Sequence, residues 1–338
     1  MAASNHKLKF IIGLVISLVF LFLAFRKVDF SQMWESLRTA NYLYLVPTVA
    51  TIFLSHFLRA FRWRYLLDPI RRVDTKSLLS SLLIGYAANV VTPAHLGEIL
   101  RAYILSKKKA LSMSAILATV VMERIIDVFS LLALMALALA IYPFPDWVVK
   151  SGTILFAVTC ALFFILVILK KSKSFAMFSM ALTHRVLPKG LAQRMDSFLE
   201  RFLSGIVPLT HWHDYITVTF LSIVIWGCYG LVFYFCLHAF GFIHAYQLAW
   251  YVSLILLVIT CVAVIVPSSP GYIGPYHYLC QITLAMFSVP AGPALSYATV
   301  VHAITFLPVL LVGLVLANYE GMSVYRASLK ENPPSSFS

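Results

Sequence analysis

The feature that most constrains this chain is a run of 105 residues, 215–319, that contains no Asp, Glu, Lys or Arg. A soluble domain carries about 25% charged residues, so a soluble stretch of this length would hold about 25 charges. A membrane-spanning helix needs about 20 apolar residues, and the run has room for roughly four full or partial passes. We therefore expect lipid, not water, to surround this half of the chain.

The composition of the whole chain points the same way. Of 338 residues, 61% are hydrophobic and 12% are charged, and the formal net charge is +13. In a soluble protein such an excess would suggest nucleic acid, but no nucleic-acid motif is present. Positive loops on the cytoplasmic side of a membrane explain the excess better. The five cysteines lie in apolar stretches without a C-x-x-C pair, which indicates packing residues and neither disulfides nor a metal site.

The first half of the chain divides into apolar runs and basic loops. The run at 10–25 has no cleavage signal and predicts a retained first span with a cytoplasmic N-terminus. The run at 42–58 ends in a basic cluster, which predicts cytoplasm again. Residues 77–105 are broken by Asn89, Pro93 and Gly97, and we expect a hairpin that enters the membrane and returns. Residues 110–145 hold two apolar runs separated by charges, and 148–169 is a clean span.

The second half begins with a segment at 175–209 that we expect to be an amphipathic cytoplasmic element on the membrane surface. Four elements follow, at 216–240, 247–266, 276–289 and 294–317. The third is too short to cross the membrane and predicts a second half-membrane helix. The predicted fold is an all-α polytopic integral membrane helix bundle of about six to eight spans with two broken or re-entrant segments. Residues 1–320 form one transmembrane domain, and 321–338 form a short tail with a disordered end.

The first candidate site lies in the broken segment between Asn89 and Arg101. Irregular backbone at membrane depth must be shielded by protein or line a water-filled cavity. A helix that starts near Pro93 or Gly97 would direct free N–H groups toward an anion. Glu98 and Arg101 are three residues apart and share a helix face. The alternative is a cytoplasmic loop with a helix cap and a salt bridge.

Two further groups stand out. Glu123, Arg124 and Asp127 interrupt an apolar stretch, and such charges are usually functional within a membrane; the alternative is a structural ion pair at the interface. The other group is the sequence from Pro267 to Pro275, through which no hydrophobic helix can continue. Half-helices broken in both halves of a chain indicate a transporter's binding site, whereas the alternative is a tight interfacial turn. The H-x-H sequence at His211 is weak support for a metal, and we expect none.

These three motifs and a fourth, Arg59-x-x-Arg62-Trp63 in the basic cluster after the second run, occur in one order and spacing: Arg59-x-x-Arg62-Trp63, Asn89 to Arg101, Glu123-Arg124-x-x-Asp127 and Pro267-x-x-Pro270-Gly271-x-x-Gly274. In this the chain resembles the lysylphosphatidylglycerol synthase transmembrane family, the flippase-like region of the multiple peptide resistance factor. The resemblance covers nearly the whole chain. It implies movement of a lipid, such as an aminoacylated phosphatidylglycerol, between leaflets. The chain ends about twenty residues after its last expected span, so we expect a standalone relative without the synthase domain.

The sequence departs from this family at the second Pro-Gly motif. The family pattern reads Pro-Gly-Gly-x-Gly-x-x-Glu, and this chain has Tyr272 at the second Gly and His277 at the Glu. The missing carboxylate puts the family's substrate chemistry in question. A histidine there can still titrate near neutral pH, and it can equally be a polar packing residue.

The function we predict is lipid translocation through a polar intramembrane cavity, by a transporter and not an enzyme. The alternatives are an intramembrane transferase acting on a lipid headgroup and a noncatalytic partner of a lipid-modifying enzyme. We expect a multi-pass protein of the cell membrane that binds phospholipid headgroups, needs no cofactor, binds no nucleic acid and is compatible with a homo-oligomer. We also expect the two broken segments to face one another. The candidate substrate-binding residues are Arg59, Arg62, Asn89, Pro93, Gly97, Glu98, Arg101, Glu123, Arg124, Asp127, Pro267, Ser268, Ser269, Gly271, Gly274 and His277.

Overall fold

The computed structural model of the chain describes residues 15–26, 28–92, 96–144, 146–171, 184, 188–265 and 270–331. It is 85% helical, and no strand occurs among these residues. The all-α prediction is therefore confirmed. A helical segment at Val15–Phe25 precedes the following elements: α2 Phe30–Thr39, η1 Tyr42–Tyr44, α3 Leu45–Leu67, α4 Thr75–Val91, α5 Leu96–Lys109, α6 Met113–Ile141, α7 Asp146–Lys171, α9 Lys189–Gly205, α10 Trp212–Ala239, α11 Phe242–Ala245, α12 Val252–Ile265, η2 Pro270–Tyr272, α13 Pro275–Ala285 and α14 Ala291–Glu331.

Five helices of the described chain are long and apolar enough to cross a membrane, namely η1 with α3, then α6, α7, α10 and α14. Shorter apolar helices lie at Val15–Phe25 and Val252–Cys261. The two apolar runs expected between 110 and 145 are one unbroken helix, α6, with its charged residues in the interior. The last span is also longer than expected, because α14 continues to Glu331 across the domain boundary predicted at residue 320.

The first hairpin consists of α4 and α5. Asp74 caps α4, because its carboxylate accepts a hydrogen bond from the Ser77 N–H at 2.9 Å, and it also pairs with Lys109 at the end of α5. The two helices approach closely at Gly85 and Gly97: a Cβ added at Gly85 would lie 2.7 Å from the Gly97 carbonyl oxygen. Glycine is therefore required at this crossing, and the hairpin expected over 77–105 is present as two packed helices.

The second hairpin consists of α12, η2 and α13. Gly271 and Gly274 both have positive φ, at 71° and 103°, a conformation that glycine adopts without a steric penalty. A Cβ at Gly274 would also lie 2.5 Å from the carbonyl oxygen of Ser17. At the far end of α13, the side-chain amide of Gln281 donates to the Ala24 carbonyl at 3.0 Å. The N-terminal segment thus packs along this hairpin.

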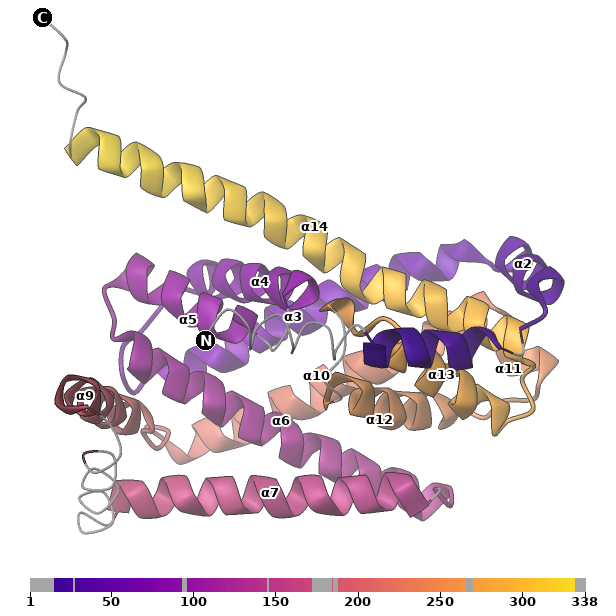
Figure 1. Cartoon of the computed structure of the whole chain (residues 1–338), viewed down its shortest axis with the longest axis horizontal. Coiled ribbons are helices and arrows are strands. Elements are labelled where there is room, and N and C mark those ends of the chain that lie inside the picture. Colours follow the sequence, from indigo (N-terminus) through magenta and orange to yellow (C-terminus); the bar gives the residue numbers. More distant parts are fainter. Residues whose placement is uncertain are drawn as a thin grey trace, which may run out of the picture.

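The two hairpins enter the bundle from opposite ends, and their tips lie side by side near its centre (Figure 1). The base of the second hairpin lies at the start of α14, where Gln281 donates to the Ala291 carbonyl. The base of the first lies at the other end, where Lys108 pairs with Glu320. At the tips, a Cβ on Gly271 would be 3.7 Å from the Val90 carbonyl oxygen. Each hairpin is preceded and followed by a long span, α3 and α6 or α10 and α14, so the two halves have inverted orientations.

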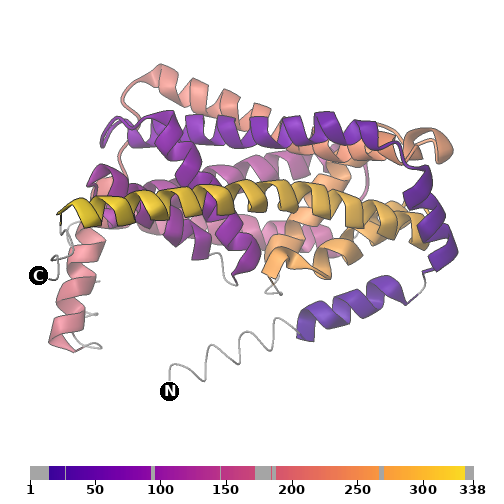
Figure 2. The ribbon, with the colours of Figure 1, turned by 90° about the horizontal axis from the view of Figure 1, so that it is seen from above.

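Basic residues gather at one end of the bundle. The end of α3, the base of the first hairpin, the end of α7 and the start of α10 all lie there (Figure 1). The amphipathic helix α9 crosses this end at a steep angle to the spans and is seen side-on in Figure 2. The Lys170 ammonium donates to the Leu203 carbonyl of α9 at 3.4 Å. The loops whose charge suggested a common side of the membrane are therefore together in space.

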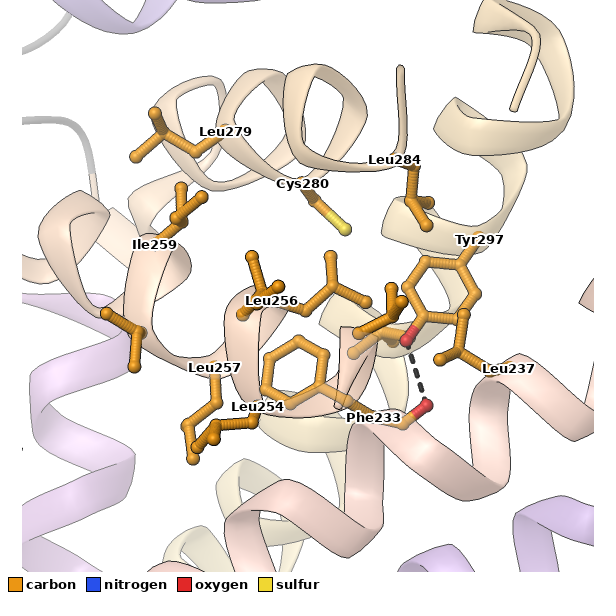
Figure 3. Packing of buried hydrophobic residues seen from close by; sticks show 14 of the residues in the cluster. Phe233, Leu237, Leu254, Leu256, Leu257, Ile259, Leu279, Cys280, Leu284 and Tyr297 are labelled. Carbon is orange, nitrogen blue, oxygen red and sulfur yellow. Dashed lines mark hydrogen bonds between the residues drawn. The ribbon is translucent and has the colours of Figure 1, made fainter. Parts of the chain in front are cut away.

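The largest apolar core surrounds the second hairpin (Figure 3). Leu256 and Cys280 from its two helices are fully buried among side chains of α10 and α14. The Tyr297 hydroxyl donates to the Phe233 carbonyl at 2.9 Å, which satisfies its polar atom within this core. The second hairpin is thereby held by side chains on both long helices of its half.

Candidate functional site: a buried network of arginines and carboxylates

The centre of the site is formed by α3 and α6. Arg59 and Arg62, three residues apart on α3, face Glu123 and Asp127, four apart on α6. Arg59 donates to Glu123 Oε1 through Nη2 at 2.7 Å and Nε at 3.2 Å. Arg62 donates to Asp127 Oδ1 at 2.6 Å. The spacing places each pair on one helical face, so each arginine contacts both carboxylates.

The first hairpin adds a third arginine. Arg101 of α5 is 2% exposed and donates to Glu123 Oε2 at 3.0 Å. Its guanidinium also lies over the Trp63 ring, 4.9 Å from the centroid, an arrangement that favours a cation. The Trp63 indole N–H donates to Thr119 Oγ1 at 2.9 Å, which fixes the ring. The broken segment is thereby joined to the charges of α6.

Glu98 and Arg124 form the more exposed rim of the network. Arg124 Nε lies 2.8 Å from Glu98 Oε1, and the two side chains are 35% and 22% exposed. Arg124 Nη1 is also 3.5 Å from Asp127. The pair therefore connects the buried centre with the outside of the first hairpin.

The structure unites all seven charged residues that the sequence singled out. It also adds three residues that were missed. Tyr229 of α10 accepts from Arg59 Nη1 at 2.8 Å, and Ser222 of α10 accepts from Arg62 Nη1 at 2.8 Å. Tyr86 of α4 lies beside both Arg59 and Arg124. Nothing in the sequence marks Ser222 and Tyr229, because they lie in the uniformly apolar α10.

The network contains more donors than its acceptors can satisfy. Four arginines face three carboxylates, which leaves one excess positive charge, and each guanidinium has five N–H donors. Arg101 Nε and Nη2 and Arg62 Nε are buried without a hydrogen-bond partner among the described residues. Unsatisfied donors of this kind cost free energy. The site thus has both the charge and the free donors to bind an anion.

The remaining candidates lie at the hairpin tips. Asn89 Oδ1 accepts from the Gly97 N–H at 2.7 Å, which closes the first tip. Gly271 and Gly274 shape the second tip, where Tyr272 is within electrostatic range of Glu98 and Arg124. His277 instead contacts His302, with ring centroids 4.8 Å apart. Pro93, Pro267, Ser268 and Ser269 lie outside the described residues. Within the described ranges, no three His, Cys, Asp or Glu side chains are grouped as metal ligands.

Long apolar helices around a buried ionic network define a polytopic membrane protein, a class in which intramembrane charges are paired and face the bundle interior. The sequence profile of the lysylphosphatidylglycerol synthase TM region matches residues 10–313, and the chain belongs to this family.

A relative is known in Methanothermobacter thermautotrophicus, where it is described as a UPF0104 membrane protein. It is 32% identical over 111 residues, which cover 32% of this chain and 33% of the relative. The chain thus aligns with about a third of the length of that relative. The relative is thus described as a membrane protein, the class to which the fold of this chain also belongs.

Proposed function

We propose that this protein is a lipid translocase that moves a phospholipid or modified lipid between leaflets, with the headgroup phosphate bound at the arginine network. The observation that carries the proposal is a pair of buried donors on Arg101, Nε and Nη2, which have no hydrogen-bond partner in the described part of the chain. They belong to a buried residue at the junction of the first hairpin with α6. A phosphate oxygen is the acceptor that such a planar donor pair fits best.

The surroundings of Arg101 support a ligand with both a charged and an apolar part. The same helix, α5, buries Arg101 and exposes Ile99 and Leu100. An acyl chain can therefore remain in lipid beside α5 while the headgroup reaches the network past Glu98 and Arg124. A phosphate monoanion would neutralise the excess positive charge, and the rim carboxylate of Glu98 is available to an amine on the headgroup.

The transferase alternative receives less support from the geometry. In such an enzyme a general acid must donate a proton and a general base must accept one, so either role requires a carboxyl group that neighbouring cations do not hold in its charged form. Glu98, Glu123 and Asp127 are each bound by at least one arginine. Their contacts suit charge balance better than proton transfer.

Lipid movement in liposomes tests the proposal. We expect Arg101→Gln and Arg124→Gln to slow transport of a labelled phospholipid severely. Loss of one charge-assisted hydrogen bond costs about 1.5–3 kcal/mol, which corresponds to roughly 10- to 100-fold in rate. Folding should survive the Arg101 change, because Glu123 retains Arg59. Lys107→Gln removes an exposed positive charge from the same helix and is the matched control.

Mass spectrometry of the lipid after the assay separates the alternatives. Unchanged lipid mass with transport supports a translocase, and a changed mass would indicate a transferase. Equal transport by wild type and both arginine variants would refute the assignment of the site.

The orientation is proposed from charge. The basic end of the bundle and the N-terminus lie in the cytoplasm of a cell membrane, because positively charged loops are retained there. In a background with the five cysteines replaced, Glu35→Cys on α2 should be labelled from outside intact cells. Lys108→Cys and Lys171→Cys should not, and ready labelling of either would reverse the topology.

A further inference from the structure

The second half of the bundle has its own buried polar pair, His277 and His302. The uncharged run 215–319 contains four histidines. Two of them, His238 and His244, lie near the end of the bundle at α10 and α11. His277 of α13 is 7% exposed, and His302 lies in the first third of α14. Polar titratable groups are costly at membrane depth and usually serve a function.

The contacts of this pair bind it to the tip of the second hairpin. His302 Nε2 lies 2.6 Å from the Gly271 carbonyl oxygen. Since a carbonyl only accepts, His302 must donate from Nε2, and its Nδ1 is the acceptor in a neutral ring. His277 Nδ1 is buried without a hydrogen-bond partner among the described residues. The pair thus holds the hairpin tip and retains an unused ring nitrogen.

The inverted arrangement of the halves gives this pair a counterpart. In the first half, Arg101 lies four residues after Gly97 and contacts Glu123, the eleventh residue of α6. In the second half, His277 lies three residues after Gly274 and contacts His302, the twelfth residue of α14. In each half, a polar side chain of the hairpin therefore contacts a polar side chain of the following span at nearly the same position. The first pair is permanently charged, and the second can gain or lose a proton.

We propose that His277 and His302 form a proton-binding site whose occupancy is coupled to opening of the second hairpin, and hence to the lipid movement proposed above. In the packed arrangement, burial favours neutral rings. When the hairpin parts from α14 and water enters, a proton binds to a ring nitrogen lone pair and forms an N–H bond. The charge on one ring opposes a second protonation of the adjacent ring, so each opening takes up one proton.

The described side chains around the histidine pair are uncharged and so do not supply a positive charge in place of a bound proton. Tyr276 packs on both rings, and its electrostatic neighbours are Cys236 of α10, Cys261 of α12 and Cys280 of its own helix. Tyr272, at the hairpin tip, is within electrostatic range of Glu98, Arg124 and Tyr86 of α4. The segment Val15–Phe25 has no ionisable side chain.

A connection to the headgroup network runs through the hairpin tip. His302 holds the Gly271 carbonyl, and the next residue, Tyr272, is the one within electrostatic range of Glu98 and Arg124. A movement of Gly271 that follows protonation of the pair would therefore also displace Tyr272, which lies near the rim of the first site. His56, a further partly buried histidine, lies on α3 and contacts Tyr86 of α4, with ring centroids 4.9 Å apart, so it belongs to the first half of the bundle.

Spin-label distances measure the opening directly. Labels at Ile273 and Leu314, both exposed positions, are placed on protein in which the five native cysteines are replaced and every histidine is retained, in nanodiscs at pH 7.5 and 5.5. With an ordinary histidine pKa of about 6.5 in the open state, the ratio of open to closed protein should rise about tenfold on acidification. Because the titration compares one protein at two pH values, its result does not depend on whether a histidine variant folds.

Variants identify the groups that bind the proton. The double change His277→Gln with His302→Gln should lose the tenfold rise, whereas His244→Gln, which alters an exposed histidine, should keep it. A wild-type population that does not change with pH would overturn the proposal, and so would an unaltered rise in the double variant. Lipid movement in liposomes is measured separately: its absence beside a clear pH response would refute the translocase and leave the proton site standing.

Discussion

Glu123 is the residue on which the buried network depends, and its replacement by Gln is our principal prediction. The side chain is fully buried and accepts hydrogen bonds from Arg59 and Arg101. Glutamine keeps the shape but removes the negative charge, which raises the local excess from one positive charge to two. Its amide N–H₂ would also face an arginine donor. Removing one partner of a buried ion pair costs about 3–5 kcal/mol.

The measurement is the apparent melting temperature of purified protein in detergent. At roughly 2 °C per kcal/mol for a chain of this size, we expect Glu123→Gln to lower it by about 6–10 °C. Asp74→Asn is the matched control, since it exchanges a half-exposed carboxylate of one ion pair for an amide. Exposed pairs contribute about 0–1 kcal/mol, so this control should move the melting temperature by less than about 2 °C.

A second substitution examines the cause. Adding Arg101→Gln to Glu123→Gln removes the guanidinium that has lost its partner, so the double variant should be more stable than the sum of the single effects predicts. Strict additivity, or a Glu123→Gln effect no larger than that of the control, would show that the charges do not act as one network.

Two further predictions concern the first hairpin. Gly97→Ala should prevent close packing of α4 on α5, because the added methyl would collide with the Gly85 carbonyl and Asn89 Oδ1. The apparent melting temperature should fall by at least several degrees. The control Gly190→Ala, where the added methyl meets no atom within 4 Å, should leave the melting temperature unchanged. The hydrogen bond from Lys109 lowers the pKa of Asp74 below its ordinary value. Because the folded pKa is below the unfolded one, the pair stabilises the protein above about pH 4 and this stability is lost on further acidification. The small difference between wild type and Asp74→Asn at pH 7 should therefore begin to decrease below about pH 4 in melting curves recorded from pH 6 to pH 3, and a difference that stays constant over this range would contradict the assignment.

The charged part of the site was predictable because membrane physics restricts where charge can lie. Arg59, Glu123 and Asp127 occur in apolar surroundings, where an unpaired charge is costly, so mutual pairing was the expected solution. The helical spacing then determined which residues share a face. The network itself, however, explains why α6 is unbroken: arginines from α3 and α5 neutralise its carboxylates, and the helix has no reason to end there.

The contacts that could not be predicted from the sequence are made by residues of helices in which nearly every side chain is uncharged. Tyr229 and Ser222 belong to a helix of 28 residues that has no charged side chain after Asp214, and only packing shows which of its residues face α3. The His277–His302 contact joins two elements 25 residues apart, and no helical or strand periodicity connects such positions. The continuation of α14 was missed because basic residues after Glu320 suggested a tail, although charged residues are good helix formers.

The last helix also determines how the two halves can move. Pro308 lies inside α14 and lacks the N–H that would bond to the Ile304 carbonyl, and the nearby Thr305 hydroxyl is buried without a partner within the described structure. On one side of Pro308, His302 and Tyr297 hold the second hairpin and its core. On the other side, Gly313 packs directly on Ala87 of the first hairpin. The two hairpins thus pack against the same helix on opposite sides of Pro308, where a backbone hydrogen bond is missing. A displacement of either hairpin would bend α14 at this point and so change the position of the other hairpin.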